Sequence, residues 1–164
     1  MRVLEKVMSL VRLDFAPNHR QPAGALVLLA TVVSIAGSLL ADALIVVVAQ
    51  ALVPSVRGYE HFQFGDYAKL TIIGVIIACV AWPVTTRITS QPRWMFFRMA
   101  VLVTLVLWLP DVYILVKGQP GKAVAFLFLM HVGIALVTYN ALVRLAPVRA
   151  LRHTSHRKAQ PVRR

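Results

Sequence analysis

The chain has 164 residues, of which 59% are hydrophobic and only 15% are charged, and its formal net charge is +12. Together with a mean hydropathy of +0.72, this composition excludes an ordinary soluble domain and leaves no room for a second folded domain beside long apolar segments. The single cysteine, Cys79, excludes an intrachain disulfide.

Residues 1–22 are predicted to form an amphipathic segment at the cytoplasmic membrane surface. At 100° per residue, the apolar side chains between residues 2 and 15 except Leu13 share one face, and Arg2, Lys6 and Arg12 share the other. Such a helix lies in the membrane interface, and these basic residues are expected to bind anionic lipid. A flexible basic leader is the alternative. A cleaved signal peptide is disfavoured because the following apolar run is too long.

Four apolar segments follow, at about residues 23–53, 68–89, 95–117 and 121–145. Each can cross a hydrocarbon layer of about 30 Å as a helix, the shorter ones with their flanks. Small residues in the first segment form a stripe that lets a neighbouring helix approach closely: Ala30, Ser34, Gly37 and Ala41. Asp66 is placed to cap the second helix. The sequence therefore predicts an all-α membrane protein, a four-transmembrane-helix antiparallel bundle in residues 23–146.

The basic residues are distributed unevenly between the two ends of these segments. Fourteen of the eighteen Lys and Arg residues lie in the N-terminal region, in the stretch 87–98 around the loop between the second and third segments, or from Arg144 onward. The positive-inside rule then places both termini in the cytoplasm. Residues 147–164 are predicted to be a basic, disordered tail. Four further arginines are expected to bind anionic lipid rather than nucleic acid: Arg93, Arg98, Arg144 and Arg149.

Three ionisable residues interrupt the apolar cores of these segments, which are residues 23–53, 70–86, 99–116 and 123–143: Asp42, Asp111 and His131. Asp111 lies six residues before the short turn 117–122 and His131 nine residues after it. This turn makes the third and fourth helices antiparallel neighbours. We therefore expect Asp111 and His131 to lie within roughly 6 Å of each other, in the outer half of the membrane. Asp42 is expected to approach the same layer from the first helix.

Hydroxyl side chains suggest a second polar layer, about 10 Å further in. Thr104 and Thr138 lie seven residues from Asp111 and His131, a spacing that keeps a residue on the same interhelical seam, and Ser38 is placed with them. The candidate ligand or proton site therefore comprises six residues: Asp42, Asp111, His131, Thr104, Thr138 and Ser38. An imidazole beside carboxylates could share a proton, contact a polar headgroup, act as an acid–base pair, ligate a metal, or simply fix helix register.

No cofactor or metal site is expected from the motifs of this sequence. One intramembrane histidine cannot ligate haem from both sides, and there is no Cys-x-x-Cys pair for thiol redox chemistry. Walker, dinucleotide-binding and His-Glu-x-x-His patterns are also missing from the sequence.

Two short motifs resemble an uncharacterised family of small four-helix membrane proteins from actinobacteria. They are Leu109-Pro110-Asp111 near the end of the third segment and Met130-His131-Val132 in the fourth. The resemblance covers about residues 23–147 and implies four spans and a plasma-membrane location, with the family's Asp and His at Asp111 and His131. It implies no activity. Arg outnumbers Lys 13 to 5, which also suggests a GC-rich bacterial genome.

Three classes of function remain open from the sequence. The leading hypothesis is a bacterial plasma-membrane protein without catalytic turnover, which binds other membrane subunits or a second copy within a membrane assembly or the envelope. A small proton-coupled transporter using Asp42 is the second class. The third is an intramembrane enzyme for lipid or sterol-like substrates, with Asp111 and His131 as its acid–base pair.

Overall fold

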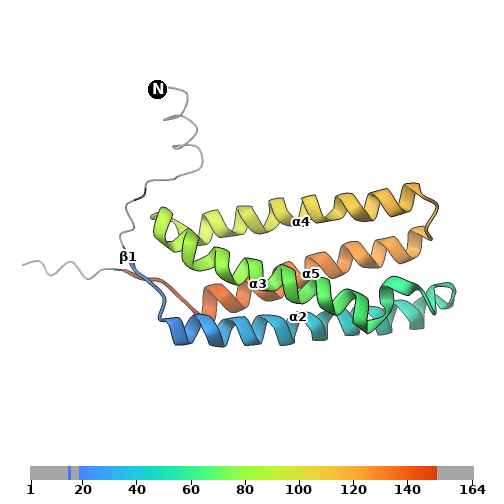
Figure 1. Ribbon diagram of the computed structural model, residues 1–164, viewed down its shortest axis with the longest axis horizontal. Coiled ribbons are helices and arrows are strands. Elements are labelled where there is room, and N and C mark those ends of the chain that lie inside the picture. Colours follow the sequence, from blue (N-terminus) through green and yellow to red (C-terminus); the bar gives the residue numbers. More distant parts are fainter. Residues whose placement is uncertain (1–14, 16–18, 151–164) are drawn as a thin grey trace, which may run out of the picture.

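A computed structural model describes Phe15 and residues 19–150, so the predicted N-terminal helix and most of the tail lie outside the described residues. Arg2, Lys6 and Arg12 therefore also lie outside them. Four long helices follow one another and lie side by side with alternating direction (Figure 1): α2 (Gly24–Leu52), α3 (Phe64–Ile88), α4 (Pro92–Val116) and α5 (Gly121–Leu145). The predicted all-α four-helix bundle is confirmed.

Each of these helices is long and apolar enough to cross a membrane, which fits a multi-pass membrane protein. We call the end that carries residues 89–91 the termini end, and the opposite end, which carries residues 53–63 and 117–120, the hairpin end (Figure 1). α3 and α4 both begin earlier than their apolar cores suggest, at Phe64 and Pro92. Pro92 suits the first turn of α4 because its fixed φ is already helical.

The expected cap at Asp66 is wrong. Gln63 is the N-cap of α3 and makes no side-chain cap hydrogen bond, because the short helix η2 (Glu60–Phe62) leads almost directly into α3. Asp66 instead lies in the first turn, with its Oδ1 3.8 Å from Lys69 Nζ. A carboxylate there still interacts favourably with the positive end of the helix dipole.

The closest helix packing joins α2 to α5. The buried side chains of α2 recur about every fourth residue and are small or polar over most of its length: Ala30, Ser34, Ser38, Asp42, Val46 and Ala49. At Gly37, an added Cβ would come within 2.9 Å of Val137 Cγ1 on α5. The predicted close approach along this part of α2 is therefore present, because glycine and serine allow the two backbones to come together.

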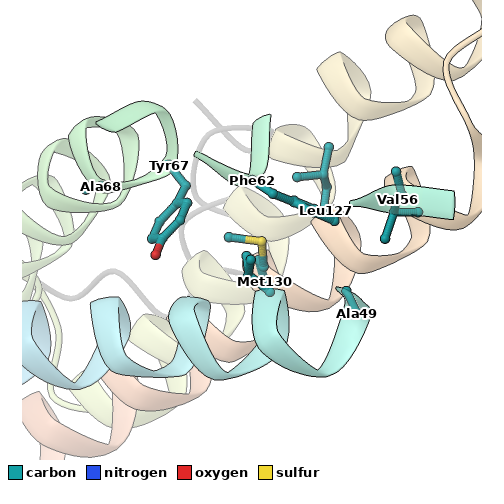
Figure 2. Packing of buried hydrophobic residues seen from close by; sticks show 9 residues of the cluster. Ala49, Val56, Phe62, Tyr67, Ala68, Leu127 and Met130 are labelled. Carbon is teal, nitrogen blue, oxygen red and sulfur yellow. The ribbon is translucent and has the colours of Figure 1, made fainter. Parts of the chain in front are cut away.

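Apolar side chains fill the bundle in two clusters, one towards each end. At the hairpin end, the loop between α2 and α3 contains η1 (Pro54–Val56) and η2, and it folds back so that Val56 and Phe62 pack near Leu127 and Met130 of α5 (Figure 2). At the termini end, Trp82, Phe96 and Leu142 join α3, α4 and α5. The indole N–H of Trp82 donates to the carbonyl of Ala146, 2.9 Å away, just after α5.

A two-strand ribbon closes the termini end, which the sequence did not predict. β1 (His19–Arg20) pairs antiparallel with β2 (Arg149–Ala150), so the segments before α2 and after α5 lie together. Two-residue strands carry no periodicity signal, and they form only because the two helix ends meet here.

Candidate functional site

The candidate site is a polar layer in the half of the bundle nearer the hairpin end, defined by Asp42, Thr71, Asp111 and His131. Asp42 is fully buried and Asp111 is 7% exposed. The four residues come from four different helices, α2, α3, α4 and α5 respectively. Charged side chains are costly inside a bilayer, so their burial within one layer is the strongest chemical feature of the described bundle.

Asp111 and His131 make the contact that the sequence predicts. Asp111 Oδ2 lies 3.2 Å from His131 Nδ1. The same nitrogen lies 2.9 Å from the carbonyl oxygen of Leu127, and because a carbonyl only accepts, Nδ1 must carry a hydrogen. That hydrogen is aimed at the carbonyl, which leaves Asp111 Oδ2 in contact with the imidazole but without a well-directed hydrogen bond among the described residues.

Asp42 is held by a residue that the sequence analysis did not name. Thr71 Oγ1 on α3 donates to Asp42 Oδ2 over 2.7 Å, and both side chains are buried. Asp42 Oδ1 has no hydrogen-bond partner in the described part of the chain. One signal was available: Thr71 is the only serine or threonine between residues 64 and 84. A lone hydroxyl in an apolar span commonly bonds across helices.

Tyr59 borders this layer from the loop between α2 and α3. Its hydroxyl is buried and has no hydrogen-bond partner in the described residues. Burial raises the pKa of Tyr59 above its ordinary value of 10.0, and the negative charges of Glu60 and Asp111 raise this pKa further. The ring contacts Phe62 edge to face, with centroids 5.2 Å apart. Tyr59 therefore contributes a neutral phenol near Asp111.

The expected hydroxyl layer is present for two of its three members. Ser38 Oγ on α2 lies 3.3 Å from Thr138 Oγ1 on α5, and both are buried. Thr104 does not join them, because its hydroxyl donates to the carbonyl of Ala100 in its own helix. Threonine readily makes this intrahelical bond, so sequence spacing alone does not place its hydroxyl between helices.

The predicted lipid-contact arginines are separate from the polar layer. Arg93, Arg98, Arg144 and Arg149 are exposed and belong to the termini end. The Arg98 guanidinium lies over the ring of Trp94, 3.8 Å from its centroid, as a cation–π contact.

Two apolar grooves open on the surface, and the polar layer lines neither of them. The first, of about 240 Å³, lies between α4 and α5 and is lined by Phe97, Ala100, Val101, Thr104, Leu105, Trp108, Val132, Ala135, Leu136 and Tyr139. The second lies between α2 and α5 and is lined by Leu44, Ile45, Val48, Phe126 and Leu129. An acid–base enzyme for lipids needs a pocket that reaches its catalytic pair, so these grooves give that hypothesis no support at Asp111 and His131.

Within residues 19–150 and Phe15, no group of three or more His, Cys, Asp or Glu side chains is arranged to hold a metal ion. Comparisons with protein-family models, curated proteins and solved structures find no match to this chain. The resemblance to the actinobacterial family stays a prediction.

Proposed function

We propose that this protein is a non-catalytic binding or accessory component of a membrane assembly, and that a transmembrane helix of another chain docks between α4 and α5. The observation that carries this proposal is the sparse packing of α4. Only 6% of its most apolar stretch is buried within the bundle, compared with 28–33% for the other three helices. α4 is thus held mainly along one edge and presents the rest of its surface outward.

The α4–α5 groove has features that suit a helix. Ala100 and Ala135 line it with small side chains, which allow close approach of a backbone. Phe97, Trp108 and Tyr139 supply aromatic walls, and Trp108, eleven residues after Phe97, lies about 16 Å further along α4. Trp108 Nε1 is also buried without an acceptor in the described residues, so one hydrogen-bond donor beside the groove has no described partner.

The buried polar contacts fit a structural role within such a component. Thr71 and Asp42 join α3 to α2, and Asp111 and His131 join α4 to α5. Side-chain contacts of this kind fix the register of neighbouring helices in a bilayer, and they need no turnover.

Site-specific photocrosslinking in native membranes tests the docking proposal. A photoreactive residue at Val101, which lines the groove, should give a discrete protein adduct. The matched control is the same residue at Leu40 on α2, which is 62% exposed and lines neither groove, and should label lipid. Ala135→Leu, which fills the groove, should abolish the Val101 adduct. Equal labelling from both positions, or no protein adduct from Val101, would contradict the proposal.

A proton-coupled transporter is the second candidate. The observation that favours it is that Asp42 Oδ1 has no hydrogen-bond partner among the residues that the structure describes. A buried carboxyl that can gain and lose a proton is the usual element of proton coupling in a membrane. Flux into proteoliposomes along a proton gradient should be lost in Asp42→Asn and kept in Thr104→Val. The absence of flux, or flux unaffected by Asp42→Asn, removes this candidate.

A further inference from the structure

The β1–β2 ribbon at the termini end places two arginines directly opposite each other. Arg20 pairs with Arg149 in the antiparallel register. Directly opposed residues of such a pair point to the same face, with Cβ atoms about 5 Å apart. Both side chains are exposed. Each lies four residues beyond a helix end, since α2 begins at Gly24 and α5 ends at Leu145.

β1 is anchored to the end of α3, and its pairing with β2 keeps Arg149 opposite Arg20. His19 Nε2 lies 2.8 Å from the carbonyl oxygen of Thr86 and donates to it, and Gln21 Nε2 donates to the same oxygen over 3.0 Å. In return, Thr86 Oγ1 donates to Gln21 Oε1 over 2.6 Å. His19 and Thr86 are buried. These bonds hold β1 on both sides of Arg20.

Two like charges held opposite each other are destabilising unless something of opposite charge lies between them. The ion pairs among the described carboxylates and cations involve Glu60, Asp66 and Asp111, which belong to the hairpin half of the bundle. No described carboxylate contacts Arg20 or Arg149. Among the described residues, the ribbon therefore holds two guanidinium-bearing side chains opposite each other with no carboxylate between them.

We propose that Arg20 and Arg149 together bind the phosphate of an anionic phospholipid headgroup. Guanidinium groups bind phosphate oxygens through paired, charge-assisted hydrogen bonds. The ribbon adjoins the ends of two apolar helices, which is the depth at which headgroups lie (Figure 1). Four more exposed arginines at the same end would raise the local concentration of anionic lipid: Arg87, Arg93, Arg98 and Arg144.

Native mass spectrometry of the full chain in detergent, titrated with phosphatidylglycerol or phosphatidylcholine, tests this proposal. The first phosphatidylglycerol should bind more tightly than phosphatidylcholine. Arg20→Gln combined with Arg149→Gln should weaken that first event about thirtyfold. The matched control is Lys117→Gln combined with Lys122→Gln, which removes two charges at the hairpin end and should leave the event unchanged. Equal weakening in the two double variants would overturn the proposal.

Thermal unfolding supplies a second readout. It compares each protein with and without lipid, so it remains valid if the double Gln variant is less stable than the wild type. Phosphatidylglycerol should raise the unfolding temperature of the wild type, and Arg20→Lys with Arg149→Lys, which keeps both charges but not the planar fork, should lose most of this rise. An equal rise with inorganic phosphate would show that the site takes a free anion and would overturn the lipid assignment. Protection by a short nucleic-acid duplex but not by phosphatidylglycerol would do the same.

Discussion

At the scale of single residues, the polar layer consists of two interhelical contacts of different quality. The Thr71–Asp42 bond is short and completely enclosed, whereas His131 Nδ1 divides its interaction between Asp111 and the Leu127 carbonyl. A short bond between enclosed groups has no water to replace a lost partner. We therefore expect the loss of the Thr71 hydroxyl to lower the stability of the fold more than the loss of a single exposed hydroxyl would.

Thr71→Val should lower the free energy of unfolding by about 1–3 kcal/mol. This exceeds the roughly 0.6 kcal/mol of an average hydrogen bond in a membrane protein, because Asp42 Oδ2 would lose its donor while Oδ1 already has none in the described residues. Thr104→Val is the control, since that hydroxyl bonds only within α4 and should change stability by about 0.5 kcal/mol or less. Denaturant titration in detergent micelles measures both. Equal losses would refute the special role of Thr71.

Tyr59 should make the fold sensitive to alkaline pH. Because its pKa is raised in the folded state, the unfolded chain loses the phenolic proton first, so the stability that Tyr59 contributes is present below pH 10 and is lost as pH rises through the folded pKa. Tyr59→Phe should flatten this decline, measured as the unfolding midpoint between pH 9 and 11. Tyr113→Phe, at an exposed ring, is the control and should leave the decline in place.

The predictability of the site differs from residue to residue for geometric reasons. Asp111 and His131 could be placed together because a short turn fixes the relative depth of α4 and α5. Thr71 could not be assigned to Asp42, because the eleven residues between α2 and α3 leave the rotation of α3 undetermined. The prediction for Thr104 was wrong for a chemical reason, since a threonine hydroxyl can donate its hydrogen bond to a carbonyl of its own helix.

At the scale of helices, the close packing of α2 against α5 depends on the absence of a side chain at Gly37. Gly37→Ala should destabilise the protein by about 1–3 kcal/mol, because the new methyl would meet Val137, whose branched side chain has little freedom to move. Gly74→Ala is the matched change on α3, where an added Cβ meets nothing within 4 Å, and it should stabilise by up to about 1 kcal/mol. Opposite signs in thermal unfolding are the expected result. Two changes of the same sign would contradict this account of the packing.

Helix existence was predictable from the sequence, and helix boundaries were less so. Apolar length decides whether a segment can span a bilayer, but α3 and α4 extend past their apolar cores into polar and aromatic residues such as Phe64 and Arg93. The sparse packing of α4 was also invisible in the sequence. Its composition matches that of its neighbours, and only the arrangement of the bundle shows how little of it is covered.

At the scale of the whole molecule, the bundle is electrically asymmetric along its length. Within the described residues, the termini end carries Arg20, Arg87, Arg93, Arg98, Arg144 and Arg149, and the carboxylates Glu60, Asp66 and Asp111 belong to the other half. Moving so many arginines across a membrane during insertion is unfavourable. From this asymmetry we predict an orientation with the termini end in the cytoplasm and the polar layer in the outer half of the membrane.

Cysteine accessibility tests this orientation, because the chain has a single cysteine, the buried Cys79. In a Cys79→Ser background, Gln119→Cys in the turn between α4 and α5 should react with a membrane-impermeant maleimide added to intact bacterial cells. Ser90→Cys, between α3 and α4, should react only after the membrane is opened. A reversed pattern would place the arginine ribbon outside the cell. The ribbon would then face the outer leaflet and not the cytoplasmic leaflet, whose anionic lipids give it a negative surface potential.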